Sequence, residues 1–120
     1  MASGVWVTTA VALVCLAGSA AEARSLKTFS GVAAFYTKSY AGRTACGERY
    51  DPGKFTAAHR TLPFGTRLRV TDVATHRSVT VRVNDRGPFT KGRVLDLSFA
   101  AAKALRMQDR GLIKVTAAVE

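Results

Sequence analysis

Three segments in the second half of the chain alternate polar and apolar side chains with a period of two. They span residues 67–71, 78–84 and 113–120, where an aliphatic residue returns at every second position. This alternation puts the apolar side chains on one face of an extended chain, so we predict three strands that each bury one face. Residues 29–36 and 93–97 are two further predicted strands.

One helix is predicted between the last two of these strands. Ser98 has the character of an N-cap residue, and the alanine-rich residues 99–107 follow it before Gly111 ends the region. Short strands separated by turn residues favour a small closed barrel over an open sheet. We therefore expect a mainly β fold.

The first part of the chain has a different pattern. Residues 5–17 form a mostly apolar run without charge, and Ala21-Glu22-Ala23 follows it, which is typical of a secretory signal peptide and its cleavage site. A membrane anchor or a buried helix is the alternative, but the run is shorter than the about 20 residues that span a bilayer. We expect residues 1–23 to be a signal peptide, residues 24–120 to be one domain, and the protein to be periplasmic or secreted without a stable membrane anchor.

Charge is concentrated in the predicted mature domain. All 18 Lys and Arg residues and seven of the eight acids lie in residues 24–120, whose net charge is +11 with histidine neutral. Such a surface attracts polyanions, and outside the cytoplasm these are wall glycans, other wall polymers and lipid headgroups. Nucleic acid binding would depend on charge alone, and we do not expect it. Cys46 is the single cysteine of this segment, which excludes an internal disulfide.

Two acids in loops beside strand ends are candidates for chemistry, namely Glu48 and Asp85. Cleavage of a glycosidic bond needs a proton for the leaving oxygen, and usually a second carboxylate. On spacing alone, Asp85 could equally cap a turn and Glu48 could be a surface charge. His59 could orient or tune a carboxylate, or it could be a structural histidine.

Other polar and aromatic residues allow two interpretations each. Arg86 could bind an anionic substrate group or cover the barrel, and Tyr36, Tyr40, Tyr50 and Phe89 could stack on sugar rings or pack in the core. Asp96 is predicted to be structural. The two histidines and Cys46 lack the spacing of metal ligands, so we expect neither a metal nor a cofactor.

Residues 31–120 resemble the RlpA-like domain, a double-psi β-barrel. The resemblance is carried in order by residues 31–36, 42–48, 56–66, 82–89, 92–98 and 100–102. It implies a six-stranded double-psi barrel with one or two short helices. Cys46 stands where this family more often has Asn or Ser, and the 42–48 segment is one residue shorter than the common pattern.

The resemblance also implies an activity. Members of the family include lytic transglycosylases that cut peptidoglycan glycan strands, often strands stripped of stem peptides, and leave 1,6-anhydromuramic acid ends. Glu48 and Asp85 match the catalytic acids of the family, and His59 matches a histidine important for activity. The alternative is a non-catalytic glycan-binding module of the expansin kind.

On the enzyme interpretation, the remaining candidates would bind substrate. The lactyl carboxylates of muramic acid would be held by Arg43, Arg60 and Arg86, and sugar rings would stack on Tyr36 and Phe89. We expect a monomer whose partner is the peptidoglycan glycan strand.

Overall fold

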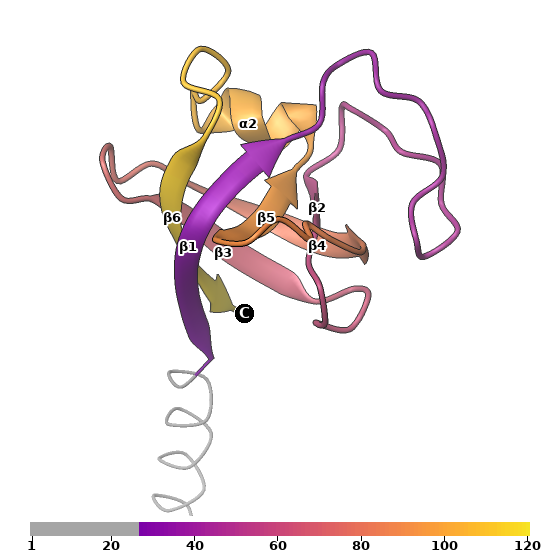
Figure 1. Cartoon of the computed structure of the whole chain (residues 1–120), viewed down its shortest axis with the longest axis horizontal. Helices are drawn as coiled ribbons and strands as arrows, with labels where there is room; N and C mark the ends of the chain where they lie inside the picture. The colour runs from indigo at the N-terminus through magenta and orange to yellow at the C-terminus, as the bar shows by residue number, and fades with distance from the viewer. Residues whose placement is uncertain (1–26) are drawn as a thin grey trace, which may run out of the picture.

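The computed structural model describes residues 27–120, so the predicted signal peptide lies outside the described residues. In the described part, six strands close into one barrel with the neighbour order β1-β5-β2-β4-β3-β6. This confirms the predicted mainly β fold and the six-stranded barrel (Figure 1). The strands are β1 (Thr28–Phe35), β2 (Thr56–Ala58), β3 (Arg67–Asp72), β4 (Ser78–Asp85), β5 (Arg93–Leu97) and β6 (Ile113–Val119).

Two parallel strand pairs set the arrangement of the barrel. β1 runs parallel to β5 and β2 runs parallel to β4, whereas the other four pairings are antiparallel. Parallel strands end at the same edge of a sheet, so the carboxyl ends of β2 and β4 lie together. The long connection over residues 36–55 leaves the end of β1 and returns to β2 (Figure 1).

The barrel interior is filled by the apolar positions of the alternating segments. Along β3, Leu68 and Val70 are fully buried, while Arg67 and Arg69 between them are exposed. The same alternation buries one face of β4 and β6, as the sequence predicts. The core consists of Ala33, Ala57, Leu68, Val70, Val81, Val83, Leu95, Leu97, Ala101, Ala102, Leu105, Met107, Ile113, Val115 and Ala117.

β2 is a strand that the sequence pattern did not predict. Its residues Thr56, Ala57 and Ala58 are all buried, and they lie between β4 and β5. Three small buried residues give no period-two signal, because both faces of the strand are covered. The alternation pattern therefore placed no strand over residues 56–58.

The predicted helix is present but shorter than expected. α2 spans Phe99–Ala104, and the prediction of a helix as far as Met107 was wrong. The chain leaves the helix at Leu105, and Arg106 takes a left-handed conformation with φ of 54°. Leu105 and Met107 are two positions apart and would point to different sides of a continuous helix. Ending the helix lets both side chains enter the core, where both are fully buried.

Ser98 joins the helix to β2. Its Oγ accepts hydrogen bonds from the backbone N–H groups of Ala101 and Thr56, each at 3.2 Å, and the side chain is fully buried. The first bond caps α2, and the second fixes the start of the strand that leads to His59. Ser98 is therefore both the N-cap of α2 and a hydrogen-bonded link between α2 and β2.

Replacing Ser98 with alanine should lower the free energy of unfolding by about 1–3 kcal/mol, because two buried N–H groups lose their acceptor. Denaturant unfolding followed by circular dichroism measures the change. Ser98→Thr keeps an oxygen at the same position and serves as the control, with a smaller loss. Equal stability of Ser98→Ala and the unsubstituted protein would contradict the role of this hydroxyl.

Candidate active site

The carboxylate of Asp85 at the end of β4 is the point where three segments of the chain meet. Oδ2 accepts a hydrogen bond from the Tyr36 hydroxyl at 2.8 Å, and Oδ1 accepts from the backbone N–H groups of Ala45 and Arg86 at 2.8 Å each. These donors come from the start of the 36–55 connection, just after β1, from the middle of the same connection and from the loop after β4. A carboxylate can accept about four hydrogen bonds. Among residues 27–120, Oδ2 therefore keeps acceptor capacity for a further partner.

Tyr36 is held in a cluster with the two other tyrosines, Tyr40 and Tyr50. The rings of Tyr36 and Tyr40 stack at 5.1 Å, and Tyr50 meets both edge-on. Burial raises the pKa of the Tyr36 hydroxyl, and the hydrogen bond to Asp85 raises it further, so the phenol stays protonated and donates. Tyr50 is buried and its hydroxyl accepts from the Phe99 N–H at 3.0 Å, which ties this tyrosine cluster to α2.

His59 follows β2 and adjoins Asp85 through the backbone. Its N–H donates to the Asp85 carbonyl at 3.2 Å. Its ring Nδ1 accepts from the N–H groups of Thr61 and Leu62, at 3.1 Å each, so the proton of the neutral ring is on Nε2. Burial lowers the pKa of the His59 ring, and the positive charges of Arg60 and Arg86 lower it further.

Arg86 anchors the loop that His59 begins. Its Nη1 donates to the carbonyl oxygens of His59 and Leu62, at 3.2 and 2.8 Å. Its guanidinium lies 4.0 Å from the centroid of the Phe64 ring, as a cation–π pair. These contacts position the loop after β2, and binding of an anionic substrate group by Arg86 stays a prediction.

Three other predicted substrate-binding residues, Arg43, Arg60 and Phe89, are exposed. Arg43 donates to the Gly47 carbonyl at 3.1 Å within its own loop, and Arg60 is exposed. Phe89 is 78% exposed, so its ring is accessible for stacking on a sugar ring. Asp96 pairs with Arg93 on the same strand, in agreement with its predicted structural role.

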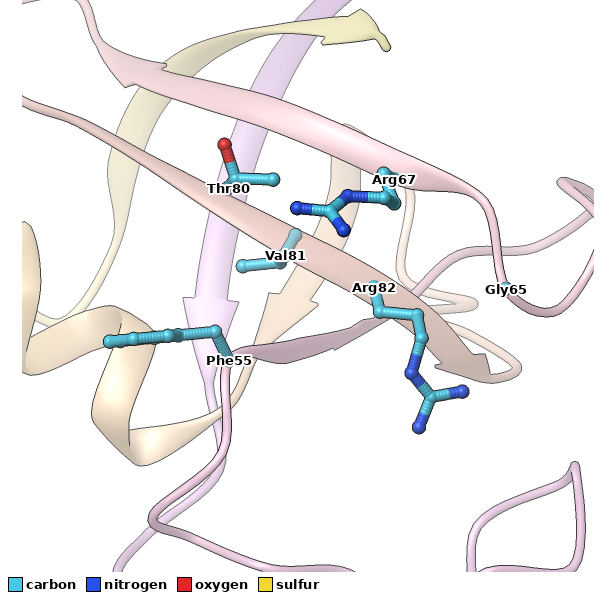
Figure 2. A pocket seen from close by; sticks show the side chains of 6 residues that line it. All are labelled: Phe55, Gly65, Arg67, Thr80, Val81 and Arg82. Atoms are coloured by element: carbon cyan, nitrogen blue, oxygen red, sulfur yellow. The ribbon is translucent and has the colours of Figure 1, made fainter.

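A hollow of about 260 Å³ lies on the outer side of β3 and β4 (Figure 2). It is lined by Phe55, Gly65, Arg67, Thr80, Val81 and Arg82. Arg82 belongs to the same strand as Asp85 and connects this hollow with the second predicted catalytic acid.

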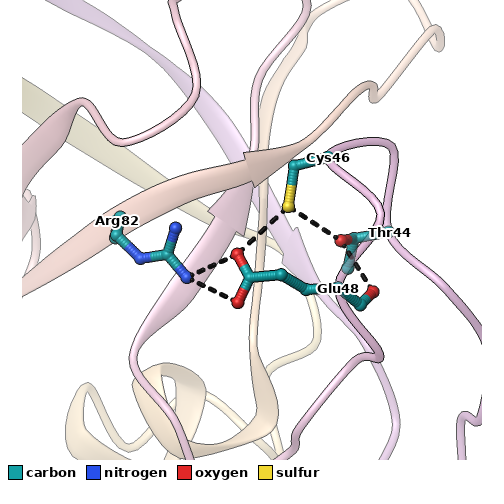
Figure 3. Close-up of polar contacts among 4 residues, drawn as sticks. All are labelled: Thr44, Cys46, Glu48 and Arg82. Atoms are coloured by element: carbon teal, nitrogen blue, oxygen red, sulfur yellow. Dashed lines mark hydrogen bonds and ion pairs between the residues drawn. The ribbon is translucent and has the colours of Figure 1, made fainter.

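Glu48 is held by Arg82 and Cys46. The Nη2 of Arg82 donates to Oε1 and Oε2 of Glu48 at 2.8 and 3.0 Å, and the Cys46 thiol donates to Oε1 at 3.1 Å (Figure 3). The hydrogen bonds from Arg82, and then that from Cys46, lower the pKa of the Glu48 carboxyl. Thr44 braces the same loop, because its hydroxyl donates to the Glu48 carbonyl at 3.0 Å. Glu48 is therefore ionised and oriented, although its side chain is 43% exposed.

Sequence reasoning missed Arg82. The available signal was its position on the outward-facing side of a predicted strand, three residues before Asp85. The sequence does not show which residue an arginine on this basic outer face pairs with, because its partner Glu48 belongs to a loop that is distant in the sequence. Only the fold shows the pairing.

The loop of residues 44–48 brings the two acids to one place. Ala45 donates its N–H to the Asp85 carboxylate, and the next residue, Cys46, donates its thiol to Glu48. The Cys46 N–H also donates to the Asn84 carbonyl at 3.2 Å, which fastens this loop to the end of β4. Glu48, Asp85 and His59 therefore all lie around the end of β4.

Residues 27–120 contain no group of three or more His, Cys, Asp or Glu side chains placed to hold a metal ion. No helix in this part of the chain is long and apolar enough to cross a membrane.

Comparison with known proteins agrees with the fold. The family model for lytic transglycolases matches residues 28–117. A probable endolytic peptidoglycan transglycosylase RlpA from Nostoc is 58% identical over 90 residues, which cover 72% of this chain and 24% of the relative. The endolytic peptidoglycan transglycosylase RlpA of Pasteurella multocida is 48% identical over 83 residues, or 68% of this chain and 28% of that protein. The chain thus spans about a quarter of the length of these curated relatives.

Solved structures share the barrel as well. The Streptomyces papain inhibitor matches with a TM-score of 0.64 and 26% identity, over 78% of this chain and 94% of that chain. The expansin of Clavibacter michiganensis matches with a TM-score of 0.60 and 25% identity, over 78% of this chain and 50% of that chain. The closed barrel, the matched residues 28–117 and the identity to the RlpA proteins together place this chain in the lytic transglycolase family, as a double-psi β-barrel.

Proposed function

We propose that this chain is a lytic transglycosylase that cleaves peptidoglycan glycan strands between N-acetylmuramic acid and N-acetylglucosamine. The observation that carries the proposal is the 58% identity to a probable endolytic peptidoglycan transglycosylase over the barrel that contains Glu48 and Asp85. The contacts of both carboxylates with one short loop support a shared role in one reaction.

In this proposal Asp85 carries the proton. Three neutral donors orient its carboxyl group, whereas Glu48 has the cationic partner Arg82, and the free lone pair of Oδ2 is where the transferred proton would sit. Protonated Asp85 would donate to the glycosidic oxygen, and the resulting carboxylate would then accept the proton of the 6-hydroxyl of the muramic acid. That hydroxyl attacks C1 of its own ring, which closes the anhydro ring and breaks the bond to the leaving sugar.

Glu48 has the complementary role. Arg82 and Cys46 favour its ionised form, so it suits stabilising the positive charge that develops at C1 better than donating a proton. His59 would act as a positioning residue, because its ring and carbonyl organise the loop that Arg86 holds beside Asp85. Arg43, Arg60 and Phe89 remain candidates for contact with the glycan.

The cellular location and the form of the substrate follow from the same proposal. We propose that residues 1–23 are removed on export and that residues 24–120 act on the cell wall outside the cytoplasm as a monomer. Strands stripped of stem peptides are the proposed substrate, because they leave the sugar backbone open to a site at the surface of a small barrel.

The second candidate function is a glycan-binding module without cleavage. Its specific support is the similarity to the Clavibacter michiganensis expansin, at 25% identity and a TM-score of 0.60. Glu48 and Asp85, both oriented by hydrogen bonds at one site, favour the enzyme.

Glu48→Gln and Asp85→Asn should each reduce the rate of glycan cleavage by about 10²–10⁴-fold, because each removes a titrating group and keeps its shape. Release of soluble fragments from purified, peptide-stripped peptidoglycan measures the rate. Asp109→Asn makes the same chemical change at an exposed acid away from these contacts, and should cleave at the unsubstituted rate. Full cleavage by both site variants would overturn the assignment.

The products should end in 1,6-anhydromuramic acid rather than in a reducing sugar. A tethered 6-hydroxyl has a large effective concentration at C1, so the site needs no bound water as nucleophile. Mass spectrometry of the fragments, before and after borohydride treatment, distinguishes the outcomes. Fragments that carry an added water and are reduced by borohydride would identify a hydrolase, and intact strands would favour the binding module.

His59 should make the stability of the fold depend on pH. Its folded pKa lies below the ordinary value, so the unfolded chain binds the proton first as the pH falls. The stabilising contribution of neutral His59 is present above the unfolded pKa and is lost as the pH falls toward the folded pKa. Protonation also removes the Nδ1 acceptor that holds Thr61 and Leu62.

Between about pH 7.5 and about pH 5, the unsubstituted protein should therefore lose more unfolding free energy than His59→Asn, whose side-chain oxygen accepts without titrating. Denaturant unfolding at several pH values gives the comparison. Parallel pH profiles for the two proteins would show that His59 does not contribute in this way.

A further inference from the structure

The hollow beside Glu48 is not used by the mechanism above. It lies between the outer faces of β3 and β4 and the residue that precedes β2, Phe55 (Figure 2). Its volume of about 260 Å³ is below the about 300–1,000 Å³ of pockets for drug-sized ligands. A single sugar unit suits this size better than an oligosaccharide.

Two arginines at directly opposite positions of neighbouring strands form the polar side of the hollow. In the β3–β4 pairing, Arg67 is the direct partner of Arg82. Like charges at directly opposite positions destabilise a sheet, so this pairing calls for an anion beside it. Glu48 supplies part of this negative charge, because its carboxylate accepts hydrogen bonds from the Nη2 atom of Arg82. A guanidinium carries five N–H donors, so Arg82 keeps donors beyond those two bonds.

Arg67 has no such partner in the described part of the chain. It is exposed, and none of the ion pairs within residues 27–120 includes it. Glu120 is next to Arg67, because its backbone N–H donates to the Arg67 carbonyl at 2.9 Å, but its side-chain carboxylate accepts from the Thr80 hydroxyl at 3.1 Å and forms no ion pair with Arg67. The positive charge of Arg67 is therefore available to a ligand.

Phe55 supplies an apolar wall. Its side chain is 51% exposed, and its carbonyl accepts the backbone N–H of Arg82 at 3.1 Å, which fixes it relative to the arginine pair. An exposed aromatic ring offers a flat apolar surface to the C–H groups on one face of a pyranose. A wall of this kind beside two guanidinium groups matches a sugar that also carries a carboxylate.

We infer that this hollow is a binding subsite for an N-acetylhexosamine that carries a carboxylate, with the ring on Phe55 and the carboxylate between Arg67 and Arg82. This inference rests on the proposed function, since muramic acid, with its lactyl carboxylate, is such a sugar. It assigns carboxylate recognition to Arg67 and Arg82, in place of the Arg43, Arg60 and Arg86 that the sequence suggested. Through Arg82, the bound carboxylate adjoins Glu48.

The test measures binding of two monosaccharide probes by NMR titration of the unsubstituted protein. The probes are the methyl β-glycosides of N-acetylmuramic acid and of N-acetylglucosamine, which differ in the lactyl carboxylate. Neither contains a bond between two sugars, so the result is independent of whether the protein cleaves glycan. The acidic probe should bind about tenfold more tightly, because its carboxylate forms charge-assisted hydrogen bonds.

Three variants locate the site. Arg67→Gln should weaken binding of the acidic probe about tenfold and leave the neutral probe unchanged, while Phe55→Ala should weaken both. Arg69→Gln is the matched control, since it removes the same charge from the same exposed face of β3, and it should change either affinity by less than about twofold.

Two results would overturn the inference. Equal losses of affinity for the acidic probe in Arg67→Gln and Arg69→Gln would mean that general surface charge attracts this probe. Equal affinity of the unsubstituted protein for the two probes would mean that no carboxylate site exists here. A protein that binds as expected but cleaves no glycan would keep the subsite and refute the proposed enzyme.

Discussion

The arrangement of the site depends on the hydrogen bonds that converge on the carboxylate of Asp85. One side chain joins the start and the middle of the long 36–55 connection to the loop after β4, at the edge where β2 and β4 end together. Without this carboxylate, three donors would lose their acceptor, and the Ala45 N–H would lose its tie to β4. The Asp85 carboxylate is thus both the proposed proton carrier and the group that holds the surrounding loops together. Asp85→Asn is therefore the informative variant, because it removes the charge and keeps the shape of the side chain.

The two acids are held by different means. Asp85 is fixed largely by the backbone and by a half-buried phenol, whereas Glu48 is held by two side chains at the surface. Exposed ion pairs contribute little to stability and are weakened by salt. The contact between Glu48 and Arg82 is therefore more readily exchanged for other partners than the backbone contacts of Asp85. On the proposed mechanism, a firmly held proton carrier beside a more loosely held carboxylate suits a substrate that itself carries negative charge.

The sequence allowed most of the barrel to be predicted, because period-two alternation is a direct consequence of one buried and one exposed face. It failed at β2, whose three small residues are covered on both sides, and at the end of α2, where burial of both Leu105 and Met107 overrides the helical tendency of the segment. Glu48, Asp85 and His59 were chosen through the resemblance to a family, since spacing alone left them ambiguous. The link between Arg82 and Glu48 is a tertiary contact, and no local pattern encodes it.

The tyrosine cluster has a practical consequence for spectroscopy. The chain has three tyrosines, and all of them lie in this cluster, in contact with Asp85 through Tyr36 and with α2 through Tyr50. The only tryptophan is Trp6, within the predicted signal peptide. After removal of residues 1–23, the intrinsic fluorescence of the protein would come from tyrosines at the site alone. The domain thus carries its own optical reporter, which senses the surroundings of Asp85 without a label.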